Sequence, residues 1–428
     1  MVSDTFKHID YISQNYSVYD QEGTNPMGTY GPVALIATPG SQKLVEQINR
    51  HLYNRRLRYL EDDPEWLTKF PGFMRNSFII EANCVRFASG EGKATLASTV
   101  RGHDIYVITD FLNFSIQYNQ YGNMEPMSAD DHFQDLIRII LAASGKGRRL
   151  NVIMPYLYES RQSIRKARES LDCAYMLKEL DALGVENIIT FDPHDPRIEN
   201  ALPRKSVEGL PVTYQMIKTL LAKYPDIILS GRPNSAMAVS TDERGMKRAI
   251  FYSSILEIPL ATFYRQRDFS LQVKGQNPIL DYHFLGDSPQ DRDLLVIDDM
   301  IITGSTFLET ARKLKKQKSS RIFGIVTFGL FVNGIAEFNK AYEEGIFDQI
   351  FCTNLNYHTP ELDSAPWFTS VDMTKYTALL IDAMNHDTSI AGLINQSGKI
   401  RSLLHKHMHN LDFMSLEDRT KARSAPID

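Results

Sequence analysis

The segment from Asp298 to Thr306 holds the densest group of residues that can do chemistry. Four apolar residues, 294–297, precede it and are typical of a buried strand, so Asp298 and Asp299 are expected at the carboxyl end of that strand. Ligands of open α/β sheets bind at this edge. The two carboxylates are suited to accept hydrogen bonds from the 2- and 3-hydroxyls of a ribose, directly or through a metal ion.

The second half of the segment has the composition of an anion-binding loop. Gly304 allows close approach of the backbone, and its neighbours supply hydroxyl donors, namely Thr303, Ser305 and Thr306. A helix is expected to start here, and the N–H groups and dipole of a helix start favour a dianion. Diol acceptors beside a phosphate loop predict ribose 5-phosphate as the ligand. The alternative is an acidic strand end followed by a Thr or Ser that only caps the helix.

Composition bounds the class of protein. The chain has 428 residues, too many for one ordinary core, so two domains are expected. The formal net charge is -5 and no basic block dominates, which argues against a nucleic-acid binder. The odd, widely spaced cysteines (Cys84, Cys173 and Cys352) indicate a reducing compartment. No signal-peptide layout and no apolar run of about 20 residues is present, so we expect a cytoplasmic protein without membrane contact.

Strands and helices are expected to alternate along most of the chain. Short β-branched or aromatic runs predict strands at 104–109, 150–154, 187–190, 226–230, 259–263, 294–297 and 322–328. Helical spacing of apolar residues predicts helices at 130–143, 170–183, 243–256, 305–316 and 335–344. The alternation predicts an α/β fold with mainly parallel sheet and helices on both faces.

A faint internal echo accompanies the two-domain length. Residues 104–110 match residues 293–299 at both outer aspartates and at a Val-Ile pair. Two unrelated buried strands would explain the same match. The expected organisation is an N-terminal extension (1–75), a first domain (76–215), a second domain (216–395) and a C-terminal tail with a solvated helix (396–428).

The segment 298–306 resembles the signature with which the phosphoribosyltransferase superfamily binds phosphoribosyl pyrophosphate. Further motifs, spread with gaps over about residues 87–394, resemble class I ribose-phosphate pyrophosphokinases. This resemblance implies two phosphoribosyltransferase-like domains with mainly parallel sheets flanked by helices, plus N- and C-terminal extensions. It also implies transfer of the β,γ-pyrophosphoryl group of ATP to ribose 5-phosphate, giving phosphoribosyl pyrophosphate and AMP for nucleotide biosynthesis.

Three motifs resemble the ATP-binding motifs of that family. Glu91 ends Phe-Ala-Ser-Gly-Glu, where the family has Phe-x-Asp-Gly-Glu, and so inherits a role in holding the nucleotide. Arg161 and Gln162 end a match to Pro-Tyr-x-x-x-x-Arg-Gln, whose last two residues contact ATP. His194 ends Asp-Pro-His in place of Asp-Leu-His, whose histidine borders the ATP and the metal site. Without the resemblance, Arg161 would be read as a surface cation and His194 as a solvated loop residue.

A fourth motif implies a metal. Residues 239–249, Val-Ser-Thr-Asp-Glu-Arg-Gly-Met-Lys-Arg-Ala, resemble Val-Ser-Pro-Asp-x-Gly-Gly-x-x-Arg-Ala. The aspartate of that motif is a magnesium ligand, which assigns the role to Asp242. The resemblance therefore implies Mg²⁺ as cofactor with His194 and Asp242 as ligands, and hard oxygen ligands suit this ion.

Some positions depart from the family pattern. The family's catalytic loop carries Lys-Arg-Arg where this chain has Arg265-Gln266-Arg267, so Arg265 and Arg267 are predicted to neutralise charge on the transferring phosphates. Arginine in place of lysine keeps the charge but changes its shape. Lys274 in the longer loop is a solvated residue or a substitute cation. Ile302 and Ser89 each replace an aspartate of the family.

The resemblance implies ATP and ribose 5-phosphate as partners and a homo-oligomer as the assembly. Two other functions stay open. A phosphoribosyltransferase that consumes phosphoribosyl pyrophosphate would explain Ile302 but leaves Glu91, Arg161 and His194 without a purpose. A non-catalytic, nucleotide-sensing homologue would explain the changed loop at Arg265.

Overall fold

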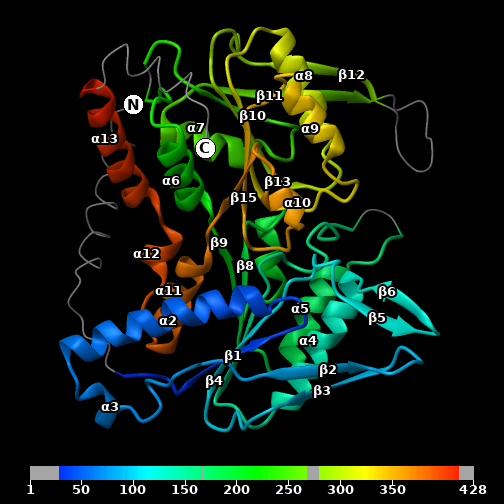
Figure 1. The fold of residues 1–428 in the computed structure, drawn as a ribbon, viewed down its shortest axis with the longest axis vertical. Coiled ribbons are helices and arrows are strands. Elements are labelled where there is room, and N and C mark those ends of the chain that lie inside the picture. Colours follow the sequence, from blue (N-terminus) through cyan, green and yellow to red (C-terminus); the bar gives the residue numbers. More distant parts are fainter. Residues whose placement is uncertain (1–27, 166–167, 231, 268–278, 414–428) are drawn as a thin grey trace. The chain divides into compact units, whose positions relative to one another are not determined.

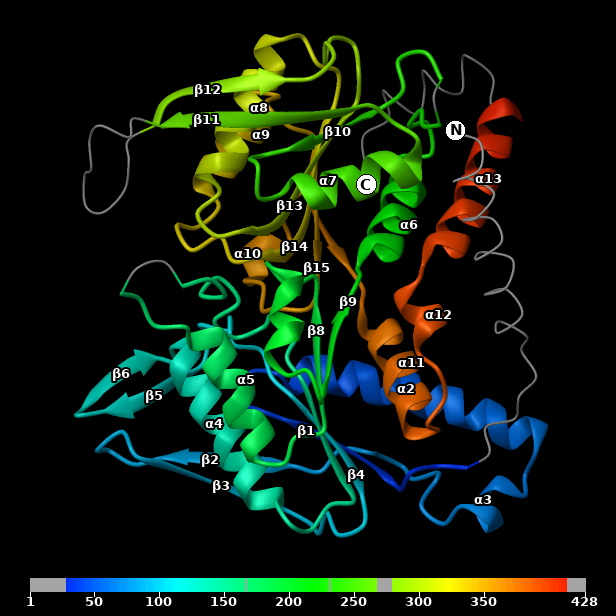
Figure 2. The same ribbon diagram turned by 180° about the vertical axis from the view of Figure 1, so that it is seen from behind.

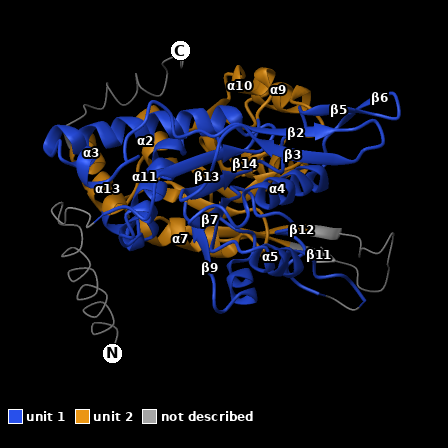
Figure 3. Ribbon diagram, turned by 90° about the horizontal axis from the view of Figure 1, so that it is seen from below, with its two compact units in different colours: residues 1–211, 354–357, 372–398 blue, residues 212–353, 358–371, 399–428 orange. Residues whose placement is uncertain are grey.

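The structure is a computed structural model that describes residues 28–165, 168–230, 232–267 and 279–413 (Figure 1). The chain forms two compact units, coloured separately in Figure 3. Unit 1 comprises residues 1–211, 354–357 and 372–398, and unit 2 comprises residues 212–353, 358–371 and 399–428. Unit 1 therefore contains both the beginning of the chain and segments from its last quarter.

Unit 1 is built on a parallel five-stranded sheet in the order β1-β4-β7-β8-β9. Its strands are β1 (Val33–Ala37), β4 (Asp104–Ile108), β7 (Arg149–Ile153), β8 (Asn187–Phe191) and β9 (Ser206–Leu210). Every residue of β4 and β7 is buried, because helices cover both faces of the sheet. These helices include α2 (Gln42–Asp62), α4 (Ala129–Ala143), α5 (Asp172–Ala182) and α11 (Thr374–Asn385). Shorter helices are α3 (Trp66–Lys69), η2 (Pro196–Ala201) and α12 (Ala391–Ile394).

Two β-hairpins extend from unit 1 side by side, as both ribbon views show (Figures 1 and 2). The first pairs β2 (Ala82–Arg86) with β3 (Gly92–Leu96), and the second pairs β5 (Gln117–Gln120) with β6 (Asn123–Pro126). Their tips touch, since the Tyr121 N–H donates to the Ala88 carbonyl at 3.1 Å.

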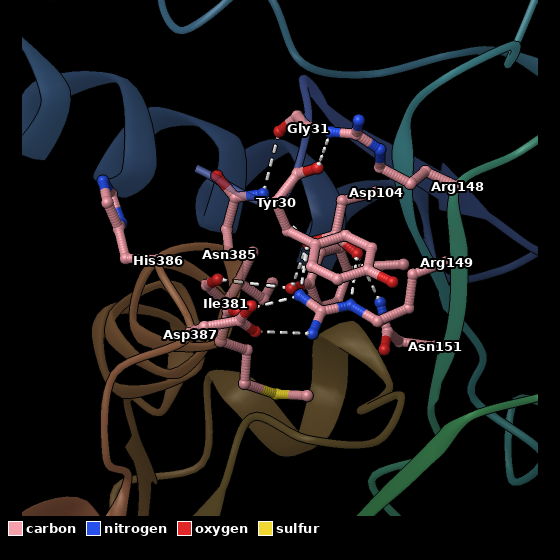
Figure 4. Close-up of polar contacts among 12 residues, drawn as sticks. Tyr30, Gly31, Asp104, Arg148, Arg149, Asn151, Ile381, Asn385, His386 and Asp387 are labelled. Atoms are coloured by element: carbon pink, nitrogen blue, oxygen red, sulfur yellow. Dashed lines mark hydrogen bonds and ion pairs between the residues drawn. The ribbon is translucent and has the colours of Figure 1, made fainter. Parts of the chain in front are cut away.

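A buried polar network fixes the C-terminal part of unit 1 to the sheet (Figure 4). Arg149 Nη2 donates to the carbonyl of Met384 at 2.7 Å and Nη1 to Asp387 at 3.0 Å. Asn385 donates to Asp104 at 2.9 Å, and its carbonyl accepts the N–H of Tyr30 at 2.7 Å. Because their polar groups find partners, Arg149 and Asp104 are stable in a buried position.

Unit 2 is built on a seven-stranded sheet in the order β12-β11-β10-β13-β14-β15-β16, parallel except that β12 runs antiparallel to β11. In chain order the strands are β10 (Met237–Ser240), β11 (Leu260–Arg267), β12 (Ile279–Leu285), β13 (Leu294–Ile301), β14 (Ile322–Gly329), β15 (Gln349–Thr353) and β16 (Phe368–Val371). Its helices are α6 (Thr213–Lys223), α7 (Met246–Leu256), α8 (Ser305–Lys316), α9 (Ala336–Glu343), α10 (Pro360–Asp363) and most of α13 (Ser397–Phe413).

The predicted α/β fold class is confirmed, and six of the seven predicted strands and all five predicted helices are present within a few residues. The strand predicted at Asp226–Ser230 is wrong. Ile227 and Leu229 are fully buried, but they lie in the connection between α6 and β10. The prediction failed because buried apolar residues outside a sheet have the same composition as a buried strand.

Two predicted boundaries also differ from the structure. Residues 33–75 are not an extension: β1 pairs with β4, and α2 buries Val45, Ile48 and Leu52. The predicted solvated helix at the C-terminus is α13, which buries one side against unit 2, where His407 Nε2 lies 3.0 Å from the Ile227 carbonyl. In the described part of the chain, no helix is long and apolar enough to cross a membrane.

Candidate functional site

The paired carboxylates Asp298 and Asp299 lie within β13, which continues to Ile301, rather than just after the strand. The Asp298 side chain accepts hydrogen bonds on both oxygens, from Thr241 Oγ1 at 2.7 Å and from the backbone N–H of Asp299 at 2.9 Å. Asp299 is largely buried, and its Oδ2 lies 3.8 Å from Arg248 Nη2. Both acids are therefore held in place at one edge of the unit 2 sheet.

Negative charge is concentrated at this edge. Burial raises the pKa of Asp298 well above its ordinary value, the charge of Asp299 raises it further, and Asp242 adds to the effect. The hydrogen bond from Thr241 acts in the opposite direction, because it favours the ionised carboxylate. A ligand that brings positive charge or hydroxyl donors to this place would relieve the repulsion between the acids.

The loop after β13 leads into α8 through Gly304, the N-cap residue, which has a φ of 83°. Thr303 and Ser305 are exposed, and their hydroxyl oxygens are 3.2 Å apart. The alternative that a Thr or Ser caps this helix is not supported, because the capping position belongs to a glycine without a side chain. The start of α8 thus presents N–H groups together with two hydroxyls, an arrangement suited to a phosphate.

Gly304 is required for two reasons. Its φ lies in the left-handed region, and a Cβ at this position would approach Phe338 Cζ to 2.1 Å. Phe338 belongs to α9 and is buried in the core of unit 2. The core of the unit therefore fixes the path of the loop on which the hydroxyls are mounted.

Asp242 organises the turn that leads into α7. Its Oδ1 accepts the backbone N–H groups of Arg244 at 2.9 Å and Gly245 at 3.1 Å. Its side chain is half-buried. The residues described contain no group of three or more His, Cys, Asp or Glu side chains able to hold a metal ion. A metal at Asp242 would consequently need oxygen ligands from a bound phosphate or from water.

The predicted ATP-binding residues all lie in unit 1. Glu91 is exposed in the turn of the β2–β3 hairpin and accepts a hydrogen bond from Ser89 Oγ at 3.0 Å. Arg161 and Gln162 are exposed in the loop after β7. The backbone N–H of His194 donates to Ser160 Oγ in this loop at 3.1 Å, which places His194 beside Arg161 in the fold. The structure thus places Arg161, Gln162 and His194 together, in the loops that follow β7 and β8.

For the predicted catalytic arginines, the structure describes the backbone only. Arg265 and Arg267 lie on β11, opposite Tyr282 and Ile279 of β12, with a register shift between residues 266 and 267. Lys274 lies outside the described residues. The roles of these cations remain predictions.

Two residues near the carboxylates were missed from the sequence. Thr241 and Arg248 both lie inside the motif 239–249. The sequence alone assigned no role to either, because the carboxylates that they contact lie about fifty residues further along the chain. The motif's resemblance to a family pattern was the available signal. Only the pairing of β10 with β13 shows which carboxylates they meet.

Comparison with known proteins agrees with this architecture. Residues 33–184 match the N-terminal domain of ribose phosphate pyrophosphokinase. A ribose-phosphate pyrophosphokinase of Shewanella oneidensis is 26% identical over 317 residues, which cover 72% of this chain and 89% of the relative. A putative ribose-phosphate pyrophosphokinase 2 of Streptococcus pyogenes is 27% identical over 254 residues, covering 59% and 69%.

The phosphoribosylpyrophosphate synthetase of Mycobacterium smegmatis has a similar fold, with a TM-score of 0.63 at 18% identity over 83% of this chain and 99% of that one. Two parallel-sheet units, one with an acid pair and a phosphate loop, define a protein of the phosphoribosyltransferase-like class. Within that class, the sequence matches confirm the resemblance noted above. The chain is thus similar to ribose-phosphate pyrophosphokinases in sequence and in fold.

Proposed function

We propose that this protein is a ribose-phosphate diphosphokinase, which transfers the pyrophosphoryl group of ATP to ribose 5-phosphate and releases AMP. The observation that carries the proposal is the geometry at the end of β13. There, a fixed acid pair is followed within five residues by a helix start whose capping position is Gly304. The match of residues 33–184 to the N-terminal domain of ribose phosphate pyrophosphokinase and the names of the relatives support the same activity.

Each half of ribose 5-phosphate has a counterpart in unit 2. Asp298 and Asp299 accept hydrogen bonds from the ribose hydroxyls, because carboxyl oxygens offer acceptor lone pairs. The 5-phosphate binds the loop and the first turn of α8, through Thr303, Gly304, Ser305 and Thr306. The two groups lie on consecutive elements of one chain segment, so their separation is set by the backbone.

ATP is bound by the residues of unit 1 that the motifs indicate, Glu91, Arg161, Gln162 and His194. The planar guanidinium of Arg161 suits phosphate or base recognition. Arg265 and Arg267 neutralise the charge that develops on the transferring phosphates, which together with positioning supplies most of the rate in such reactions. No covalent intermediate with the protein is required.

Magnesium fits the residues present. Asp242 offers a half-buried carboxylate near Asp298, and the shared negative charge of this edge is reflected in the raised pKa of Asp298. Asp242 would hold the ion together with substrate oxygens, in line with the preference of Mg²⁺ for a few protein ligands plus phosphates and water. The ligand role that the family motif implies for His194 of unit 1 stays a prediction. When bound, the ion would screen the charge of the triphosphate.

The test is identification of the nucleotide product after incubation of purified protein with ATP, Mg²⁺ and ribose 5-phosphate. AMP together with phosphoribosyl pyrophosphate is expected. ADP would indicate a simple kinase and would contradict the proposal. Absence of turnover with retained ATP binding would favour the nucleotide-sensing function, for which the Arg265-Gln266 departure is the motivating feature.

A further inference from the structure

We infer that Thr241 is a positioning residue of the sugar-phosphate site, whose hydroxyl orients the Asp298 carboxylate toward the ribose hydroxyls. This inference rests on the proposed function and adds a residue to it. Thr241 follows directly after β10, and β10 pairs with β13 such that Ser240 lies opposite Ile297. The next residues of the two strands, Thr241 and Asp298, therefore lie side by side.

The contact between them is short and shielded. Thr241 is 2% exposed, and its Oγ1 donates to Asp298 Oδ2 at 2.7 Å. The other carboxylate oxygen accepts the Asp299 N–H at 2.9 Å. With one donor on each oxygen, the plane of the carboxylate is fixed. A hydrogen bond to a charged group is also stronger than one between neutral groups.

Thr241 is itself held by a second layer of contacts. Its carbonyl accepts a hydrogen bond from Tyr282 Oη at 2.5 Å, and the same Oη lies 3.0 Å from Thr310 Oγ1 in α8. The Tyr282 ring stacks on Phe263 with centroids 4.6 Å apart. Lys313, also in α8, donates to the Tyr282 carbonyl at 3.0 Å.

This layer connects the two ends of the proposed ligand. α8 carries the phosphate loop at its start, and Thr310 and Lys313 of the same helix contact Tyr282. Tyr282 in turn holds Thr241, which holds Asp298. The position of the diol acceptors is thus coupled to the position of the phosphate-binding helix through a chain of direct contacts.

The hydroxyl is a particular feature of this chain relative to the motif that it resembles. Thr241 stands where the motif has proline, and proline has no hydroxyl to donate. We therefore expect that removal of the Thr241 hydroxyl weakens sugar-phosphate binding and does not affect folding alone.

The experiment compares Thr241→Val with Thr241→Ser in the full-length protein. Valine keeps the shape and removes the hydroxyl, whereas serine keeps the hydroxyl. For Thr241→Val we expect the KM for ribose 5-phosphate to rise about tenfold or more, because one hydrogen bond to the Asp298 carboxyl group is lost. The KM for ATP and kcat should change less than about twofold, because the contact serves ground state and transition state alike. Thr241→Ser should restore wild-type values.

Thr353→Val serves as the matched control. Thr353 is a buried threonine of the same sheet whose Oγ1 donates to the Thr327 carbonyl at 2.5 Å, not to a carboxylate of the site. It should leave the KM for ribose 5-phosphate unchanged. If Thr241→Val fails to fold, Thr241→Ala removes the hydroxyl without adding bulk and is predicted to give the same rise in KM.

Calorimetric titration of ribose 5-phosphate separates the two claims. If the wild-type protein neither binds this sugar phosphate nor makes AMP, the proposed function fails. If the wild type does both and Thr241→Val matches it, the role of Thr241 is overturned. A Thr241→Ser variant as impaired as Thr241→Val would also overturn it, because shape and not the hydroxyl would then be responsible.

Discussion

Arg149 forms a bidentate ion pair with Asp104, with Nε 2.8 Å from Oδ1 and Nη2 2.8 Å from Oδ2. Unit 2 repeats this pair with the same atoms, since Arg321 Nε lies 3.0 Å from Asp293 Oδ1 and Nη2 lies 2.6 Å from Oδ2. In unit 1 the two residues are the first of the parallel neighbours β4 and β7, and in unit 2 they directly precede the parallel neighbours β13 and β14.

The echo between residues 104–110 and 293–299 therefore has a structural counterpart at its first aspartate. Its last aspartates, Asp110 and Asp299, lie at the opposite end of the two strands, where ligands of such sheets bind. Only Asp299 is followed by a glycine loop and a helix start. The two units thus share a structural device at one end of the strand and diverge at the other.

Arg149→Met should destabilise unit 1 by about 3–5 kcal/mol, because it leaves the fully buried Asp104 without its charge partner. Arg197→Met is the control: Arg197 also pairs with an aspartate, at 2.6 Å, but is 67% exposed, and its loss should leave the melting temperature nearly unchanged. Thermal unfolding of both variants checks this. Equal effects on the two melting curves would contradict the assigned role of the buried pair.

Gly304→Ala should lower both the stability of unit 2 and the affinity for ribose 5-phosphate. Left-handed φ costs an alanine about 1–2 kcal/mol, and the clash with Phe338 adds about 1–3 kcal/mol. Gly334→Ala provides the comparison, since Gly334 has a φ of 75° but a Cβ added there would meet no atom within 4 Å. Denaturant unfolding and sugar-phosphate titration of the two variants should differ. A Gly304→Ala variant that behaves like Gly334→Ala would show that Phe338 does not constrain the loop.

Asp299→Asn should weaken ribose 5-phosphate binding at least tenfold while leaving ATP binding and the melting temperature nearly unchanged. The substitution keeps the size of the side chain but removes a charge-assisted acceptor for a hydroxyl, worth about 1.5–3 kcal/mol. Isothermal titration with each substrate is the measurement, and Asp287→Asn, an exposed aspartate of the same unit, is the control. Unchanged sugar-phosphate affinity would remove Asp299 from the site.

Asp110 should make the stability of unit 1 depend on pH. Burial raises its pKa to about 7, although the N–H groups of Leu112 and Tyr357 partly oppose this. Between the ordinary aspartate pKa of about 4 and about 7, the folded chain holds a proton that the unfolded chain releases. The stability contributed by the neutral form is therefore present at low pH and is lost as pH rises through this window, by about 1.4 kcal/mol per pH unit.

Asp110→Asn cannot titrate and should lack this slope. The quantity to compare is the difference in melting temperature between wild type and variant at about pH 5 and about pH 8. The substitution also removes a carboxylate acceptor, but the resulting change in melting temperature is the same at both pH values and cancels in this comparison. The melting temperature of the wild type should fall relative to that of the variant as pH rises. Parallel pH profiles of the two melting temperatures would rule out a titrating Asp110.

Much of the fold was predictable because strand periodicity and burial coincide in segments such as Leu294–Ile297. The prediction failed at Asp226–Ser230, where Ile227 and Leu229 are buried by tertiary packing alone. It also missed α2, because its buried face includes a charged residue. Arg56 is fully buried and donates to the Phe73 carbonyl and to Asn385, each at 2.6 Å, and Asn385 lies 329 residues away along the chain.

The candidate site divides in the same way. Asp298, Gly304 and Ser305 were predictable, because acid pair, loop and helix start are contiguous in sequence. Thr241 was not, since its partner Asp298 is 57 residues away and only strand pairing brings the two together. Local motifs indicate candidate ligand-binding residues, whereas the side chains that contact these candidates depend on the register of the sheet.

The most direct test of the proposed function follows the phosphates of ATP. The protein is incubated with ribose 5-phosphate, Mg²⁺ and ATP labelled either at the γ- or at the α-phosphate, and the products are separated. The proposal predicts the γ-label in the sugar product and the α-label in AMP. Retention of the γ-label in ATP, or its release as free phosphate with ADP, would contradict it.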